Sequence, residues 1–421
     1  MSLKARISKL PGYNQVVLPY HHVKSWHAAS KSDYPAAGMR VIGVTGTNGK
    51  STTCYMIFHM LKEAGYKVGL LTTVTYGTWR KLHDETMHMT TASPKLLNKR
   101  ISDMRDAGVE YLVLEVTSHA LTQGRIFGIP IEVAVMTNVT HEHLDYHRTF
   151  ERYREAKTRL FAKADFGIIN ADDQNAANFA VFTKKHITYG VKNGKLRAES
   201  IKLDSNGVGY TVPDINLKVR TQIPGYFNVY NSLATVAVGQ YLGLSKKQIC
   251  QGIASLEGIE GRMTRINEGQ NFDVIVDFAH TPDSFEKLLS DMRQAIGKKR
   301  RLLVLFGSAG RRDETKRAVQ GKIAGKYADI LVLTEEDDRD IDGNEILNQI
   351  EAGAKAAGAK NITKILDRKK AIEFVFSKAR KDDVVMLLGK GHEKTIERQD
   401  GEHPWNETQI ARKLLKSHKK N

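Results

Sequence analysis

Short apolar runs, separated by segments long enough to form a helix, recur along most of this 421-residue chain. Their residues are apolar at consecutive positions rather than at alternate ones, which is typical of parallel strands buried on both faces of a sheet. The runs lie at 39–44, 111–116, 133–136, 273–277, 301–306, 330–333 and 383–388. This pattern predicts an α/β fold with mostly parallel sheets.

The alternation of apolar runs and helix-length segments stops in segment 186–224, where short strand-like stretches are separated by turn signals. Ser205-Asn206-Gly207 is a good hairpin signal, because Asn and Gly tolerate the backbone conformations of tight turns. We expect an antiparallel insertion or sheet edge in this segment.

Three domains or segments are predicted along the chain. Residues 1–40 precede the first strand and are too few for a substantial independent domain. Residues 41–261 form a central domain, and a boundary near Gly261-Arg262 separates it from a second α/β domain, residues 262–421.

Composition excludes several classes of protein. No stretch approaches the roughly 20 apolar residues that a membrane-spanning helix needs, and the start lacks the apolar core of a secretory signal. Cys54 and Cys250 are too few for a disulfide framework or a zinc site, so we expect buried thiols in the reducing cytoplasm. The net charge of +17 is spread along the chain without a nucleic-acid-binding motif, so we expect no nucleic-acid partner and no membrane.

A glycine-rich segment follows the first apolar run: Gly43-Val44-Thr45-Gly46-Thr47-Asn48-Gly49-Lys50-Ser51-Thr52. It resembles G-x-x-x-x-G-K-S, with five residues instead of four between Gly43 and Gly49, and it lies between a strand and a helical stretch. Glycines let backbone N–H groups converge on phosphate oxygens, and the helix N-terminus adds partial positive charge. We expect Lys50 to reach the β and γ phosphates of a nucleoside triphosphate and the Ser51 hydroxyl to bind Mg²⁺. The alternative is a tight turn that binds nothing.

Further motifs resemble those of the Mur ligase family and follow in the family's order over most of the chain. They are Thr45–Thr52, Glu115-Val116-Thr117-Ser118-His119, Asn138–His147, Asn228–Asn231, Gly261-Arg262-Met263, Asp277–His280 and Gly389–Glu393. The resemblance implies a central ATP-binding domain of the phosphate-loop type with a mostly parallel sheet, and a C-terminal Rossmann-like α/β domain. It also implies ATP and two Mg²⁺ ions as cofactors.

The resemblance assigns the chemistry to Lys50, Glu115, His143 and Lys157. Ser51, Glu115 and His143 would bind Mg²⁺. Lys157 would do so after reaction with CO₂ to a carbamate, which turns a cation into an oxygen ligand. The residues alone also allow Glu115 to be a solvated carboxylate at a strand end and Lys157 to be a solvated charge on a helix.

The histidines of Asn138–His147 could be taken for a zinc cluster. His143 and His147 are four residues apart, but the order H-E-x-x-H of metalloproteases is absent. His141 and His147 can be ordinary polar loop residues.

The resemblance implies a nucleotide site that extends beyond the phosphate loop. Its members would be Asn138, Asn228, Asn231, Arg262, Asp277 and His280. Asn228 and Asn231 would read the adenine, although Asn228 can also be a helix cap. Asp277 and His280 would close over the ribose and phosphates when the last domain moves in.

Candidates for substrate contact are Thr90, Thr91, Ser118, Arg125, Arg312, Asp337, Arg339, Gly389 and Glu393. Arg339 lies where family members pair an arginine with the distal carboxylate of meso-diaminopimelate, a fork-like contact. Here Asp337 and Asp338 replace the family's Asn and Pro, and the extra acids favour a cationic side chain such as lysine. The identity of the amino acid that is added therefore stays open.

The implied activity is ATP-dependent addition of the third amino acid, meso-diaminopimelate or lysine, to UDP-N-acetylmuramoyl-L-alanyl-D-glutamate through an acyl phosphate. We expect a cytoplasmic monomer. Only residues 1–40 precede the first strand, whereas family members with this activity carry a UDP-binding domain there, so recognition of UDP is not implied. The family's T-T-P appears as Thr90-Thr91-Ala92-Ser93-Pro94. Phe306–Asp313 resembles the family's F-G-x-G-G-x-R-D, with Ala309 in place of a usual glycine.

Two other functions remain open at this point. One is a sister amide ligase, such as a folylpolyglutamate synthase or a ligase for another cell-wall precursor. The other is a nucleotide-binding protein without catalysis, which would show no ATP turnover with any amino acid.

Overall fold

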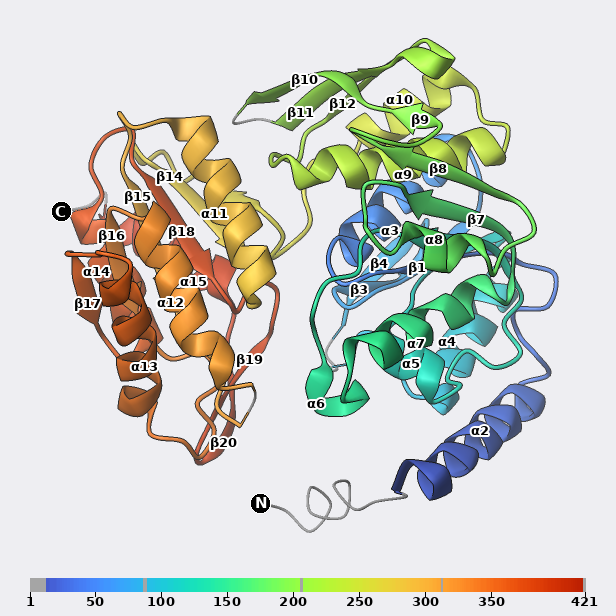
Figure 1. Ribbon diagram of the computed structural model, residues 1–421, viewed down its shortest axis with the longest axis horizontal. Helices are drawn as coiled ribbons and strands as arrows, with labels where there is room; N and C mark the ends of the chain where they lie inside the picture. The colour runs from blue at the N-terminus through green and yellow to red at the C-terminus, as the bar shows by residue number, and fades with distance from the viewer. Residues whose placement is uncertain (1–12, 86–88, 205–206, 312, 419–421) are drawn as a thin grey trace. The chain divides into compact units, whose positions relative to one another are not determined.

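The computed structural model describes residues 13–85, 89–204, 207–311 and 313–418, which divide between two compact units (Figure 1). The first unit comprises Met1–Lys202, Gly209–Thr221 and Asn228–Leu256, and the second comprises Leu203–Val208, Gln222–Phe227 and Glu257–Asn421. Each unit is described by itself. The domain limits at 41–261 and 262–421 stay a prediction.

A nine-stranded sheet, ordered β4-β3-β2-β5-β1-β6-β7-β8-β9, forms the centre of the first unit in the described residues. Its strands are β1 (Arg40–Thr45), β2 (Val68–Leu71), β3 (Thr75–Thr78), β4 (Lys81–Asp84), β5 (Tyr111–Glu115), β6 (Ile131–Met136), β7 (Ala164–Asn170), β8 (His186–Gly190) and β9 (Leu196–Arg197). Strand β1 pairs in parallel with β5 on one side and β6 on the other. The carboxyl ends of these three strands therefore meet at one edge, where ligands of such sheets bind.

The apolar runs of the sequence form the buried strands. Every residue of β5 is buried, and so are all residues of β1 after Arg40. Residues from β1, β5, β6 and the helices beside them form one hydrophobic cluster. Burial on both sheet faces explains why apolar residues occupy consecutive positions.

Helices of the first unit pack on this sheet or on one another, and a further three-stranded sheet comes before α9 and α10 in the sequence. The helices are α2 (Tyr13–Lys31), α3 (Lys50–Glu63), α4 (Pro94–Asp106), α5 (Ser118–Thr122), α6 (Leu144–His147), α7 (Phe150–Phe161), α8 (Ala176–Ala180), α9 (Phe227–Tyr241) and α10 (Lys246–Ala254). The three-stranded sheet contains β10 (Glu199–Asp204), β11 (Gly207–Val212) and β12 (Leu217–Thr221).

The prediction for segment 186–224 was wrong about antiparallel pairing in its first part, although β9 does form an edge of the sheet. Strand β8 pairs in parallel with β7, and β9 pairs in parallel with β8, so both extend the main sheet. Helix α8 lies between β7 and β8 in sequence and provides the crossover that a parallel pair needs. Of the predicted turn Ser205-Asn206-Gly207, residues 205–206 lie outside the described residues.

A six-stranded sheet, ordered β13-β14-β18-β15-β16-β17, forms the centre of the second unit. Its strands are β13 (Thr264–Ile266), β14 (Asp273–Asp277), β15 (Leu302–Phe306), β16 (Ile330–Leu333), β17 (Ile362–Lys364) and β18 (Val384–Leu388). Only the β13–β14 pair is antiparallel among the pairs of this sheet in the described residues. The hairpin β19 (Thr395–Arg398) and β20 (Gly401–Pro404) follows.

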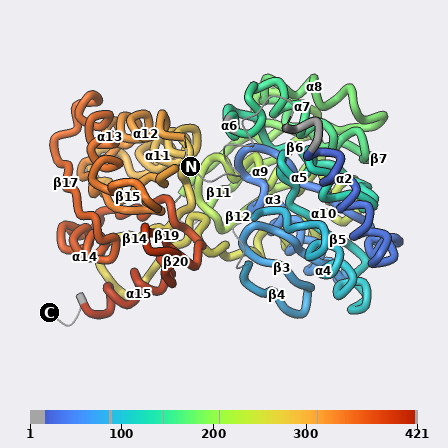
Figure 2. The backbone as a smooth tube through the Cα atoms, turned by 90° about the horizontal axis from the view of Figure 1, so that it is seen from below, coloured from blue at the N-terminus to red at the C-terminus, as the bar shows by residue number. Residues whose placement is uncertain are grey.

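Helices cover both faces of this second sheet. Figure 2 shows α11 (Pro282–Ile296), α12 (Thr315–Tyr327) and α13 (Gly343–Ala356) on one face and α14 (Arg368–Lys378) and α15 (Glu407–His418) on the other. The α/β prediction is confirmed for both units. Among the described residues, none of the helices combines the length and apolar character needed to cross a lipid bilayer.

Candidate active site

The glycine-rich segment forms a tight loop between β1 and α3. Gly49 is the residue before the helix and has a φ of 83°, a left-handed conformation that glycine adopts without steric cost. A Cβ atom on Gly49 would lie 2.4 Å from Asn231 Oδ1, and one on Gly46 would lie 1.8 Å from Thr137 Oγ1. Both glycines therefore permit a close backbone approach as well as the turn.

Side chains of the residues that follow β6 hold this loop by hydrogen bonds. The Thr137 hydroxyl donates to the Asn48 carbonyl at 2.7 Å. The Asn138 amide donates to the same carbonyl at 2.9 Å, and its oxygen accepts from the Asn48 N–H at 3.0 Å. Asn138, predicted to line the ATP site, thus binds the loop through two hydrogen bonds and fixes its backbone.

The two predicted metal ligands nearest the loop contact each other. The Ser51 hydroxyl, in the first turn of α3, donates to Glu115 Oε2 at 2.8 Å. Glu115 ends β5, and only 2% of its surface is exposed. The same oxygen accepts from the backbone N–H and hydroxyl of Thr73, at 3.0 and 3.1 Å. Sequence analysis missed Thr73, although it follows β2, a neighbour of β5.

Two lysines point at the carbonyls of the loop. Lys50 Nζ donates to the Thr47 carbonyl at 2.7 Å, and Lys157 Nζ, from α7, donates to the Gly46 carbonyl at 2.6 Å. Lys157 is only 2% exposed. Burial, and then the charge of Lys50, hold the pKa of Lys157 well below its usual value. The alternative of a solvated lysine on a helix is therefore wrong.

His143 lies in a group of aromatic side chains. It is the residue before α6, with a φ of 55°, and its ring centroid lies 4.8 Å from that of His119. Its Nε2 is 3.7 Å from Glu142 Oε2. In the part of the chain that the structure describes, no three His, Cys, Asp or Glu side chains gather as a metal site would require.

His147 is buried instead of being a polar loop residue. Its Nε2 lies 3.0 Å from the Ser118 hydroxyl, and Ser118 is buried as well. Burial, reinforced by neighbouring His119, lowers the pKa of His147 to about 3. The ring is therefore neutral at physiological pH and holds Ser118 in place.

The predicted substrate residues of the first unit surround the end of β5. The Thr91 hydroxyl donates to the Glu115 carbonyl at 3.1 Å and accepts from the Thr117 N–H at 3.2 Å. Arg125 donates to the Thr91 carbonyl at 2.6 Å. Thr90 is half-buried beside Thr91. The structure therefore brings Thr91, Ser118 and Arg125 to the edge that carries Glu115.

Asn228 and Asn231 lie at the start of α9 and bind each other. The Asn231 amide donates to Asn228 Oδ1 at 2.8 Å, and both side chains are buried. The Thr53 hydroxyl donates to Asn231 Oδ1 at 3.3 Å and links α9 to α3. This contact places the pair next to the helix that follows the phosphate loop.

The remaining nucleotide candidates belong to the second unit. Asp277, at the end of β14, accepts from the Met263 N–H at 2.8 Å and from the Ala279 N–H at 2.7 Å. Burial raises the pKa of Asp277, and the nearby charge of Arg262 opposes that rise. The Arg262 guanidinium lies 4.7 Å above the Phe278 ring, and His280 Nδ1 lies 2.9 Å from the Phe278 carbonyl.

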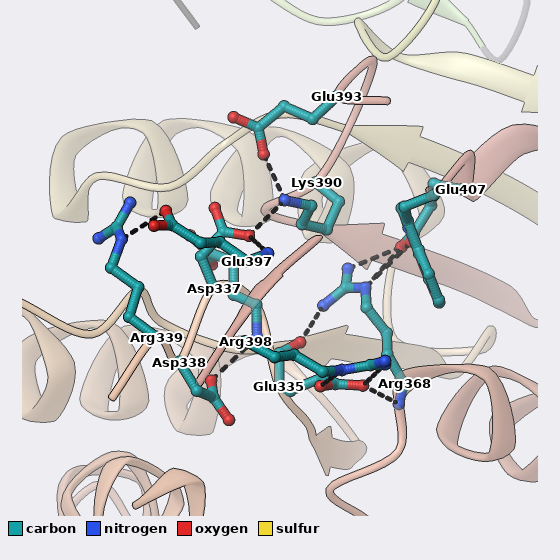
Figure 3. A network of polar contacts seen from close by, with 12 residues as sticks. Glu335, Asp337, Asp338, Arg339, Arg368, Lys390, Glu393, Glu397, Arg398 and Glu407 are labelled. Atoms are coloured by element: carbon teal, nitrogen blue, oxygen red, sulfur yellow. Dashed lines mark hydrogen bonds and ion pairs between the residues drawn. The ribbon is translucent and has the colours of Figure 1, made fainter. Parts of the chain in front are cut away.

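Acidic and basic side chains of the second unit form a dense network (Figure 3). Lys390 is fully buried, and its Nζ lies 2.8 Å from Asp337 and 2.6 Å from Glu393. Arg339 Nε donates to Glu397 at 2.7 Å. Sequence analysis missed Glu397, because 58 residues separate it from its partner. Arg312 lies outside the described residues.

Glu336 is a further acid that the sequence analysis left out. Its carboxylate lies against Gly389, where a Cβ atom would come within 2.7 Å of Oε2. Burial raises the pKa of Glu336 to about 7. Its place in the acidic run 335–338 was the available signal.

Two family models match the chain. Residues 44–239 match the Mur ligase middle domain, and residues 261–391 match the Mur ligase glutamate ligase domain.

Curated relatives and a solved structure extend this likeness. The UDP-N-acetylmuramoyl-L-alanyl-D-glutamate–2,6-diaminopimelate ligase of Geobacillus thermodenitrificans is 40% identical over 374 residues, which cover 85% of this chain and 75% of the relative. The UDP-N-acetylmuramyl-tripeptide synthetase of Deinococcus radiodurans is 39% identical over 395 residues, covering 92% and 80%. A solved UDP-N-acetylmuramoyl-L-alanyl-D-glutamate–2,6-diaminopimelate ligase superposes with a TM-score of 0.65 at 27% identity, covering 95% of this chain and 82% of that one.

Proposed function

This chain belongs to the Mur ligase family of ATP-dependent ligases, and we propose that it adds the third amino acid to UDP-N-acetylmuramoyl-L-alanyl-D-glutamate in peptidoglycan synthesis. The observation that carries the proposal is the contact between the phosphate loop and the end of β5. There Ser51 and Glu115 lie 2.8 Å apart, and Lys50 and Lys157 bind the loop carbonyls.

The donor atoms at this edge suit Mg²⁺. A hydroxyl and a carboxylate, both nearly buried, supply the hard oxygen ligands that Mg²⁺ prefers. The Lys157 amine does not fit as it stands, but its carbamate would add a further oxygen donor. We propose that Ser51, Glu115, His143 and carbamylated Lys157 hold two ions with ATP, and the ions would neutralise phosphate charge.

The proposed reaction has two steps. A carboxylate oxygen of the D-glutamyl residue attacks the γ-phosphorus of ATP, the bond to the β-γ bridging oxygen breaks, and ADP leaves. The amine of the new amino acid then attacks the acyl carbon of the resulting acyl phosphate. The C–N bond forms, the C–O bond to phosphate breaks, and inorganic phosphate and a proton are released.

The chain's own residues assist by positioning and by charge. Lys50 would leave the Thr47 carbonyl and bind the transferring phosphoryl oxygens, since a fixed cation stabilises charge that develops there. Asn138 keeps the loop backbone in place, and Thr91 and Arg125 would position the muramoyl peptide. Asn228, Asn231, Arg262, Asp277 and His280 would contact the nucleotide. We also propose that the enzyme is cytoplasmic, because its nucleotide-sugar substrate is soluble, and that it is a monomer.

The test measures phosphate release and product mass with the purified chain, ATP, Mg²⁺ and UDP-N-acetylmuramoyl-L-alanyl-D-glutamate, together with meso-diaminopimelate or L-lysine. We expect a product heavier by one amino acid residue and a loss of more than about 10³-fold in Lys50→Ala, as expected when charge stabilisation is removed. Lys62→Ala, in the last turn of the same helix, is the control and should keep full activity.

Turnover only with a folate and glutamate would instead support a folylpolyglutamate synthase. Absence of turnover with every amino acid, combined with ATP binding, would indicate a nucleotide-binding protein without catalysis.

A further inference from the structure

We infer that the amino-acid site of this chain selects an amino acid whose side chain ends in an ammonium group and carries no second carboxylate, the chemical class of lysine and ornithine. The inference rests on the proposed function, with Gly389 and Glu393 as the candidates for contact with the incoming amino acid. It depends on how Arg339, Glu336 and Glu397 are paired.

Arg339, the residue expected to bind a distal carboxylate, is already occupied. Its Nε donates to Glu397 Oε2 at 2.7 Å, and its Nη1 donates to the Gly310 carbonyl. Its backbone N–H also donates to the Glu397 carbonyl at 3.1 Å, which fixes the residue against β19. A bidentate contact needs two parallel N–H groups on one edge of the guanidinium. The Glu397 carboxylate thus already holds the Nε edge of the guanidinium, one of the edges that a substrate carboxylate would use.

Lys390 offers no free charge for a substrate carboxylate either. Its buried Nζ lies between Asp337, at 2.8 Å, and Glu393, at 2.6 Å. Two carboxylates already share this single ammonium group (Figure 3). A third carboxylate nearby would be repelled rather than bound.

Glu336 supplies the group that an ammonium would pair with. The residue is 6% exposed, and within the described residues its carboxylate makes no hydrogen bond and no ion pair, although the charges of Lys316 and Lys390 act on it and oppose the rise of its pKa. It nevertheless lies at the predicted site, because Oε2 is 2.7 Å from the position of a Cβ on Gly389. A buried carboxylate without a partner is unfavourable, and a substrate ammonium would remove that cost.

The net charge of the side chains around this site also favours an ammonium group. Its carboxylates are Glu336, Asp337, Glu393 and Glu397, and its cations are Arg339, Lys390 and Lys316, whose charge acts on Glu336. Because carboxylates outnumber cations, a side chain ending in an ammonium group alone is complementary. A side chain that adds a carboxylate increases the excess of negative charge.

The experiment compares L-lysine, L-ornithine, L-norleucine and meso-diaminopimelate as acceptors for the full chain with ATP and UDP-N-acetylmuramoyl-L-alanyl-D-glutamate. We expect kcat/KM for L-lysine to exceed that for meso-diaminopimelate and for L-norleucine by at least about 10-fold, the value of one charged hydrogen bond. A preference for meso-diaminopimelate overturns the inference and leaves the proposed function intact. Failure with all four contradicts the proposed function itself.

Two variants test the assigned residues. Glu397→Gln should release Arg339 and move the ratio of kcat/KM by about 10-fold toward meso-diaminopimelate. Glu402→Gln, the register partner of Glu397 in the β19–β20 hairpin, is the matched control and should leave the ratio unchanged. Glu336→Gln should reduce the preference for L-lysine over L-norleucine by about 10-fold. An unchanged preference would overturn the role of Glu336.

Discussion

The Ser51 hydroxyl donates a 2.8 Å hydrogen bond to Glu115 Oε2 and so joins the first turn of α3 to the end of β5. The contact arises because β1, which leads into the phosphate loop, pairs in parallel with β5. Their carboxyl ends therefore lie at one edge, with the glycine-rich loop after one strand and a buried carboxylate at the end of the other.

Removal of either oxygen should impair use of Mg²⁺. For Ser51→Ala and Glu115→Gln we expect kcat to fall by about 10²–10³-fold, because oxygen ligands that balance phosphate charge are lost. The Mg²⁺ concentration for half-maximal activity should rise in both variants and stay constant in Lys62→Ala. Unchanged Mg²⁺ titrations in both would refute the ligand role.

Gly49 should tolerate a side chain less well than a glycine of similar backbone conformation. Gly49 and Gly65 have φ values of 83° and 91°, but a Cβ on Gly49 would lie 2.4 Å from Asn231 Oδ1, whereas one on Gly65 would have nothing within 4 Å. Both alanine variants should lose about 1 kcal/mol of stability from backbone strain.

Only Gly49→Ala should also weaken binding of a non-hydrolysable ATP analogue, by about 5- to 30-fold, the effect of about 1–2 kcal/mol of added strain. Calorimetric titration of both variants measures this difference. Equal affinities would show that the close approach to Asn231 does not shape the nucleotide site.

Lys157 should carry CO₂ in the active enzyme. Burial beside Lys50 holds its pKa well below the usual value, so the neutral amine that reacts with CO₂ is favoured. We expect a carbamate signal in ¹³C NMR after incubation with ¹³C-bicarbonate, absent in Lys157→Ala. Activity should fall in CO₂-depleted buffer and return with bicarbonate, while Lys157→Ala loses more than about 10³-fold in either buffer.

The elements that the sequence predicted well are those set by local pattern. The apolar runs became β1, β5, β6, β14, β15, β16 and β18, since burial on both faces leaves a continuous signal. The tight loop between β1 and α3 could also be predicted from the sequence, because its backbone conformation requires glycine at particular positions. The parallel pairing of β8 was not, because short strands show no difference between parallel and antiparallel partners.

Contacts between distant side chains could not be read in this way. Thr73 bonds Glu115 across 42 residues, and Arg339 bonds Glu397 across 58. Such pairs depend on the order of strands in the sheet and on the path of a hairpin, and neither can be predicted from the local sequence. The charge of Arg339 alone therefore suggested a site for a substrate carboxylate, whereas its actual partner changes that expectation.

Glu336 should make the stability of the chain depend on pH in a defined direction. Its pKa in the folded protein is raised to about 7 from 4.5, so the folded state binds a proton more tightly than the unfolded state does. The stabilisation from this proton is complete below pH 4.5 and is lost as the pH rises through about 7. Glu336→Gln keeps a neutral side chain of similar shape and removes this loss.

We therefore expect Glu336→Gln to be more stable than the wild type at pH 8 by about 1–3 kcal/mol, and to differ little from it at pH 5. Urea unfolding at both pH values, followed by circular dichroism, measures the difference. Glu373→Gln, an exposed position on α14, is the control and should show no such pH dependence. If the effect of Glu336→Gln were the same at both pH values, the carboxylate would already be ionised and partnered in the free enzyme, and it would then have no unmet charge to offer a substrate ammonium group.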